Sequence, residues 1–79
     1  MNNHIRYFKM RSYDLDKAIM YYRVFPSGSY QCRATGWSAW LSINATWENR
    51  LPFFVHKPIS VSKLEILIML GPEALNEVI

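Results

Sequence analysis

Hydrophobic and polar residues alternate with a period of two on both sides of a clear turn signal. The turn segment is Phe25-Pro26-Ser27-Gly28-Ser29. Proline presets the backbone for the second position of a type I turn, and glycine accepts the left-handed conformation that closes a three-residue hairpin loop. If Phe25 pairs with Ser29, the register of both arms follows. The expected cross-strand pairs are Val24–Tyr30, Arg23–Gln31, Tyr22–Cys32, Tyr21–Arg33 and Met20–Ala34.

This register sorts the hairpin side chains by polarity, because directly paired residues lie on the same side of a sheet. One face is apolar and is expected to be buried: Met20, Tyr22, Val24, Tyr30, Cys32 and Ala34. The other face is expected to meet solvent: Tyr21, Arg23, Gln31 and Arg33, with Phe25 at the tip. A helix over residues 14–22 is the alternative for the first arm, since its apolar residues also form a helical stripe.

Three further segments have strand character. Ile5 to Arg11 predicts a strand with Phe8 and Met10 on its buried side. Residues 37–44 alternate as a strand would and extend the meander, although the spacing of the apolar residues over 37–47 also fits a helix. Residues 53–56 predict a short edge strand, because a proline stops the chain on either side of them.

The C-terminal part of the sequence predicts a helix. Ser62 to Glu65 matches a capping box, and Gly71-Pro72 follows the last apolar residue, as is typical of a helix end. The expected core face consists of Leu64, Leu67, Ile68 and Leu70, whereas Ile66 and Met69 extend the apolar surface around the other side. A short second helix is expected over residues 73–78.

Together these elements predict one α+β domain over residues 1–79. We expect a small antiparallel sheet of three or four strands, with one or two C-terminal helices packed on its apolar face. A chain of this length builds only a small core, so part of its apolar surface is expected to enter an interface.

Composition and charge set limits on compartment and partners. The net charge of +3 is concentrated in residues 1–57, which permits nucleic acid or an acidic protein surface as a partner and requires neither. The longest apolar run, residues 66–70, is far shorter than the roughly 20 residues that span a bilayer. The N-terminus lacks the apolar segment of a signal peptide, and the single cysteine suits a reducing compartment. We therefore expect a cytoplasmic protein without a membrane partner.

Catalysis and metal binding are not expected. Cys32 lies on the apolar face of the predicted hairpin, where a thiol is usually a small core residue instead of a nucleophile activated by His56. His4, Asp14 and Asp16 do not show the ligand spacing of zinc or calcium sites. A pocket for a small-molecule substrate is also hard to build in so small a domain. The sequence thus predicts no enzyme, no cofactor and no metal.

The first functional hypothesis is a non-catalytic protein-binding module. Three Trp, five Tyr and four Phe in 79 residues exceed what one small core needs, and such side chains often anchor interfaces. The candidate contact residues are Trp40, Trp47, Phe53, Phe54, Ile66 and Met69. Such a chain would modulate or inhibit a larger partner by occupying its surface, as small phage and mobile-element accessory proteins do, and would form a homodimer if two copies pair.

The alternative hypothesis is binding of single-stranded nucleic acid. Aromatic and basic side chains on one sheet face stack bases and follow the phosphate backbone. The candidate residues are Tyr21, Arg23, Phe25 and Arg33, with Arg6, Lys9 and Arg11 on an adjacent strand.

Overall fold

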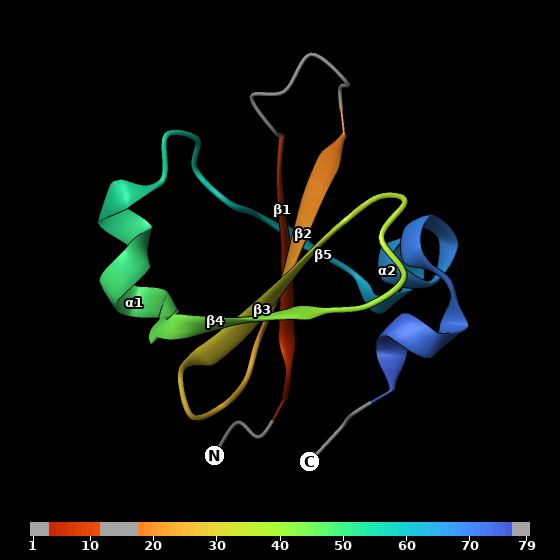
Figure 1. Ribbon diagram of the computed structural model, residues 1–79, viewed down its shortest axis with the longest axis horizontal. Coiled ribbons are helices and arrows are strands. Elements are labelled where there is room, and N and C mark those ends of the chain that lie inside the picture. The colour runs from red at the N-terminus through yellow and green to blue at the C-terminus, as the bar shows by residue number, and fades with distance from the viewer. Residues whose placement is uncertain (1–3, 12–17, 77–79) are drawn as a thin grey trace.

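The computed structural model describes residues 4–11 and 18–76. It has an α+β fold with a five-stranded antiparallel sheet of order β4-β3-β2-β1-β5 and two short α-helices (Figure 1). The strands are β1 (Arg6–Arg11), β2 (Ile19–Val24), β3 (Ser29–Ala34), β4 (Leu41–Thr46) and β5 (Ile59–Val61). The helices are α1 (Trp47–Arg50) and α2 (Lys63–Leu70), each followed by a 3-10 segment, η1 (Leu51–Phe53) and η2 (Pro72–Leu75).

The predicted hairpin is confirmed pair by pair between β2 and β3. The Phe25 N–H donates to Ser29 O, and the Gly28 N–H donates to Phe25 O, both at 2.9 Å. Gly28 has φ +97°, which is the left-handed backbone that the turn requires. Residues 19–22 therefore form a strand and not a helix, whereas residues 14–17 lie outside the described part of the chain.

The other predicted strands are confirmed only in part. β1 follows the expectation, with Phe8 opposite Tyr22 on the apolar side of the sheet. β4 begins at Leu41 and not at residue 37, because the chain first turns at Gly36 (φ +93°). The helical alternative for residues 37–47 holds only at its end, where α1 begins with Trp47.

The edge strand expected at residues 53–56 is wrong. Pro52 lies near the start of η1, where its fixed φ suits a 3-10 turn and its missing N–H costs no hydrogen bond. The chain becomes extended only after Pro58, where β5 pairs with β1 through Tyr7–Val61 and Lys9–Ile59. The sheet therefore has five strands where three or four were expected.

Helical segments cover both faces of the sheet, α1 with η1 on one side and α2 with η2 on the other (Figure 1). The expectation that the C-terminal helices cover the apolar face is wrong. Trp47, which directly follows β4, packs there with Val24 and Tyr30 in one buried cluster. α2 instead follows β5 and packs on the opposite face, where Ile66 joins Tyr21 in a second cluster. Because Trp47 and its cluster occupy the apolar face, α2 packs on the polar face.

The predicted start of α2 at Ser62 is confirmed, but the predicted orientation of the helix is wrong. The Ser62 hydroxyl accepts a hydrogen bond from the Glu65 N–H at 3.2 Å. The Glu65 carboxylate bonds to Lys9 and Tyr21, so the N-cap half of the capping box is the part that the structure shows. Ile66, expected outside, has no exposed surface, whereas Leu64 and Ile68, expected inside, are 62% and 69% exposed. The second helix is only the 3-10 segment Pro72–Leu75, and residues 77–78 lie outside the described part of the chain.

Candidate protein-binding surface

Trp47, one of the expected contact residues, is a core residue. Its ring stacks on Phe8 with centroids 5.0 Å apart and an interplanar angle of 24°. Tyr30 meets the same indole edge-on at 5.2 Å, and Tyr22 and Phe54 pack against it at 5.4 and 5.3 Å. This aromatic cluster fills the space between α1 and the sheet. Trp47 therefore belongs to the core, and the half-buried Phe54 packs against it.

Trp40 is also held within the molecule. Its indole N–H donates to Ala74 O at 3.0 Å, and its ring lies 4.7 Å from the Arg23 guanidinium carbon. A cation held over an indole in this way is favourable when it is shielded from water. The tryptophan thus links the loop before β4 to η2, and it is not a projecting anchor for a partner.

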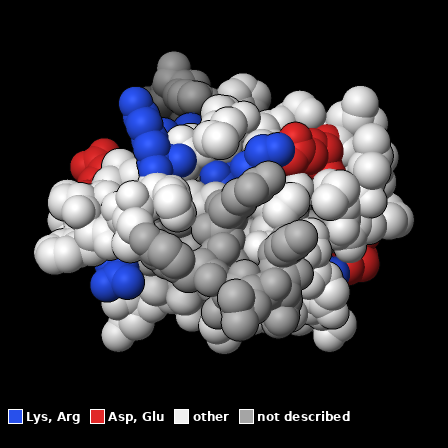
Figure 2. Space-filling model, turned by 90° about the horizontal axis from the view of Figure 1, so that it is seen from above, with Lys and Arg blue, Asp and Glu red and all other residues white. Residues whose placement is uncertain are grey.

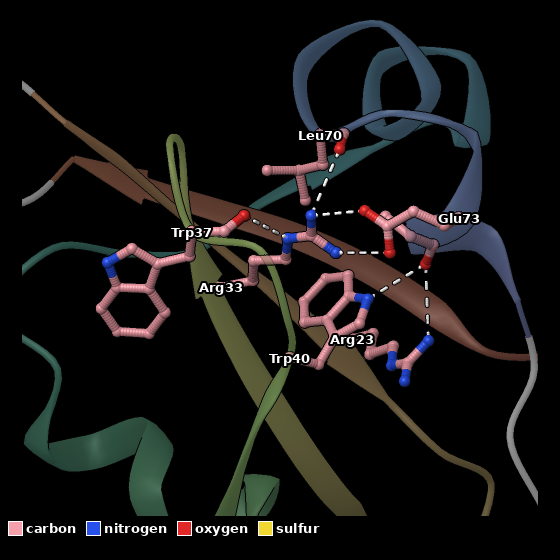
Figure 3. Close-up of polar contacts among 7 residues, drawn as sticks. Arg23, Arg33, Trp37, Trp40, Leu70 and Glu73 are labelled. Carbon is pink, nitrogen blue, oxygen red and sulfur yellow. Dashed lines mark hydrogen bonds and ion pairs between the residues drawn. The ribbon is translucent and has the colours of Figure 1, made fainter.

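Arg23 and Arg33 lie beneath η2 and are each only 3% exposed (Figure 3). Arg33 donates to Trp37 O at 3.0 Å, to Leu70 O at 3.4 Å and to both carboxylate oxygens of Glu73. A buried guanidinium is tolerated when acceptors such as these satisfy its donors. The two arginines therefore bind the C-terminal segment to the sheet.

Arg23 also binds the C-terminal segment. Its Nε donates to the Gln31 side chain at 2.6 Å, and its Nη1 donates to the backbone oxygens of Ala74 and Asn76 at 3.4 and 2.9 Å. Phe25 lies against the same guanidinium at 5.4 Å. The expectation that this face of the hairpin meets solvent is therefore wrong, because the C-terminal segment covers it.

The residues expected to bind nucleic acid do not form one surface in this structure. Tyr21, Arg23 and Arg33 are buried. Lys9 lies on their side of the sheet and forms an ion pair with Glu65, whereas Arg6 lies on the opposite side, 5.8 Å from the Phe8 ring. Arg11 closes β1. On the face shown in Figure 2, the Lys and Arg atoms form separate patches and not a continuous basic stripe.

A group of large apolar side chains is exposed on α2 and on the strand that precedes it. We call those on the helix the α2 surface: Leu64, Leu67, Ile68 and Met69. Ile59 is the exposed apolar residue on β5. Residues 64, 67 and 68 are spaced as i, i+3 and i+4, so they share one side of the helix. Met69 was expected to contact a partner and belongs to this group, whereas Ile66 is buried against the sheet.

A hollow of about 390 Å³ lies beside the α2 surface. Its lining combines apolar side chains from α2 and β2 with polar side chains from the sheet and from the start of α2: Lys9, Ile19, Tyr21, Ser62, Leu64, Glu65, Ile68 and Met69. One carboxylate oxygen of Glu65 accepts from Lys9 Nζ at 2.8 Å and from the Tyr21 hydroxyl at 2.9 Å. These bonds occupy the polar groups with one another, so the hollow mainly offers apolar contact.

The ionisation of this polar group follows from its contacts. The hydrogen bond from Lys9 is the main cause that lowers the pKa of Glu65, and the bond from Tyr21 adds to it. Burial, followed by the hydrogen bond to Glu65, raises the pKa of Tyr21 to about 12. At neutral pH Glu65 is therefore a carboxylate and Tyr21 a neutral phenol. The hydrogen bonds from Lys9 and Tyr21 hold Glu65, and with it the helix, on the sheet.

A second, smaller apolar group lies around η1 on the other side of the sheet. Phe53, an expected contact residue, is 74% exposed, and Leu51 and Val55 are exposed beside it in the sequence. These three residues lie in a 3-10 turn and the loop after it, without the regular spacing of the α2 surface. We therefore take the α2 surface as the candidate site.

Burial governs the chemistry of the cysteine thiol. Cys32 is buried on the apolar side of the sheet, and this burial raises the pKa of its thiol, which disfavours the reactive thiolate. Within residues 4–11 and 18–76, no three His, Cys, Asp or Glu side chains are placed to hold a metal ion. Asp14 and Asp16 lie outside that range.

Two further observations bear on the class of protein. No helix in the described part of the chain has the length and apolar character needed to cross a bilayer. Comparison with protein-family models, with curated proteins and with solved structures finds no match for this chain. The α2 surface is therefore the feature of this chain from which a function can be inferred.

Proposed function

We propose that this chain is a non-catalytic protein-binding module that docks through the α2 surface into an apolar groove of a larger protein. By occupying that groove, the module would modulate or inhibit its partner. The observation that supports this proposal is the exposure of Leu64 and Ile68 on a helix whose buried side is already occupied by Ile66. Contiguous exposed apolar side chains on a small protein commonly mark an interaction site.

The spacing of the exposed residues suits a groove. Amphipathic helices that bind in grooves use anchors at positions i, i+3 and i+4, and residues 64, 67 and 68 have this spacing. Met69 widens the apolar area of the helix, and a methionine adapts its shape to an uneven partner surface. The charged residues of α2, Lys63 and Glu65, lie at the start of the helix and leave the remainder apolar.

The helix is also held rigidly, which favours binding. Ser62 caps its first turn, Glu65 is bound to β1 and β2, and Leu70 O accepts a hydrogen bond from Arg33. A helix that is already ordered loses little conformational entropy when it docks. More of the favourable free energy of apolar contact then appears as affinity.

The proposal is tested by site-specific photocrosslinking in cells that make the protein. A benzophenone amino acid replaces Ile68 on the α2 surface or, as a control, the exposed Asn49 on α1 across the sheet. We expect position 68, and not position 49, to form an adduct with one larger protein. Binding of that purified protein is then expected to weaken by at least about tenfold in Ile68→Lys, but not in Asn49→Lys.

Two results would contradict the proposal. One is equal adduct formation from positions 68 and 49. The other is a purified partner whose affinity is unchanged by Ile68→Lys, since a lysine in an apolar groove must lose its hydration without a counter-charge.

A further inference from the structure

The two edges of the sheet differ in how they are protected. β5 is only three residues long, begins after Lys57-Pro58 and is followed closely by Lys63. Short length, proline and lysine are the features that keep an edge strand from pairing with another chain. β4 is six residues long, and the sequence has no charged residue and no proline from Gly36 to Trp47. The pairing with β3 shifts between Ser29 and Tyr30, so that Asn44 and Ala45 bulge out of the ladder and the regular part of this edge is residues 41–43. That part of the β4 edge therefore carries neither charge nor proline to block pairing.

The direction of the backbone groups along β4 follows from the hairpin. The bonds Phe25 N to Ser29 O and Thr35 N to Ile19 O show that the odd-numbered residues of β3 bond to β2. Backbone groups alternate in direction along a strand, so Tyr30 and Cys32 bond to the opposite side, where they face Ile43 and Leu41. Ser42, between those two, therefore directs its N–H and C=O away from β3. Neither α1 nor α2 lies over this edge in Figure 1.

We infer that β4 pairs with β4 of a second copy of this chain, antiparallel and with Ser42 opposite Ser42. The pair would join two five-stranded sheets into one sheet. This inference does not rest on the proposed function, because β4 and the strand beside α2 lie at opposite edges of the sheet.

Three features favour a second copy as the occupant. An edge strand offers backbone donors and acceptors, which another extended strand matches. In a two-fold antiparallel pair the residue on the axis faces its own equivalent and the other residues face residues of the same strand, so a charge-free edge meets itself without like-charge repulsion. The Ser42 register also places Leu41, which is 53% exposed, opposite Ile43 of the second copy on the same face of the sheet. The pair thus covers apolar surface that one copy leaves open.

The test is the mass in solution, measured by sedimentation equilibrium from micromolar to millimolar concentration. The wild-type chain is expected to approach twice its 9.3 kDa mass. Ser42→Lys and Ser42→Glu are each expected to remain monomeric, because like charges then face each other across the two-fold axis. An equal mixture of the two variants is expected to form a dimer again, since opposite charges now face each other. Recovery in the mixture also shows that both variants are folded.

Ser60→Lys is the matched control, because it places the same charge on an exposed serine of the other edge strand. It is expected to dimerise as the wild type does. A wild-type chain that stays monomeric at millimolar concentration overturns the inference. So does a dimer that persists in Ser42→Lys, a mixture that stays monomeric, or a dimer that Ile68→Lys abolishes while Ser42→Lys leaves it intact.

Discussion

Arg33 and Glu73 form a bidentate ion pair, although they are 40 residues apart in the sequence. Arg33 Nη1 lies 3.0 Å from one carboxylate oxygen of Glu73, and Nη2 lies 2.5 Å from the other. The guanidinium is buried, whereas 56% of the Glu73 side chain is exposed. The pair therefore fixes η2, and with it the end of α2, to the centre of the sheet.

Replacing Arg33 by methionine is expected to lower the free energy of unfolding by about 2–3 kcal/mol. Trp37 O and Leu70 O would lose a donor inside the protein, and an unsatisfied buried acceptor is costly. Chemical denaturation measures the change. Lys9→Met removes the half-exposed ion pair with Glu65 and is expected to cost no more than about 1 kcal/mol. Equal losses in the two variants would show that Arg33 does not hold the C-terminal segment.

Acid is expected to destabilise the fold through Glu73 and Glu65. The hydrogen bond from Arg33 is the main cause that lowers the pKa of Glu73, and that from Lys9 does the same for Glu65. A carboxyl whose pKa is lower in the folded state contributes stability above its unfolded pKa, near 4.5, and loses that contribution as the pH falls through the folded value.

Thermal unfolding between about pH 6 and pH 3 tests this expectation. The melting temperature of Glu73→Gln is expected to fall less over this interval than that of the wild type, because the glutamine side chain does not titrate. The melting temperature of Glu48→Gln, an exposed control in the first turn of α1, is expected to fall as much as that of the wild type. An acid response of Glu73→Gln that matches the wild type would contradict the role given to Glu73.

Alkali is expected to destabilise the fold through Tyr21. Burial raises the pKa of this phenol from 10.0 to about 12. A group with a raised folded pKa contributes stability that is complete below its unfolded value and is lost as the pH rises through the folded value. The wild type is therefore expected to lose stability between about pH 10 and pH 12, and Tyr21→Phe to lose less of it. Denaturant unfolding at several pH values across this interval measures the free energy of unfolding of both proteins. Equal losses in the wild type and in Tyr21→Phe would contradict the role given to Tyr21.

The sequence predicted those parts of the fold that depend on local chemistry. The β2–β3 register follows from Pro26 and Gly28, and the start of α2 follows from the Ser62 cap. It did not predict that the polar face of the hairpin is buried, because the acceptors that the C-terminal segment provides for Arg33, on Leu70 and Glu73, lie 37 and 40 residues away. Burial of an arginine depends on partners that only the tertiary structure brings near.

The candidate site was predicted less well, for a related reason. Residues 66–70 are all apolar, so helical periodicity gives α2 no polar side by which to orient it. The contact of Glu65 with Lys9 and Tyr21 fixes the rotation, and Lys9 is 56 residues away. Of the six expected contact residues, Phe53 and Met69 are exposed, Phe54 is half-buried, and the remaining three pack into the molecule as follows: Trp40, Trp47 and Ile66.

The rotation of α2 decides which residues form the docking surface, and a pair of isoleucine substitutions tests it directly. Ile66→Ala is expected to lower the free energy of unfolding by about 2–5 kcal/mol, because it opens a cavity against the sheet. Ile68→Ala, two positions along the same helix, is expected to change it by less than about 0.5 kcal/mol, because that side chain is exposed. The opposite order, with Ile68→Ala the more costly substitution, would place the exposed side chain in the core and remove the proposed surface.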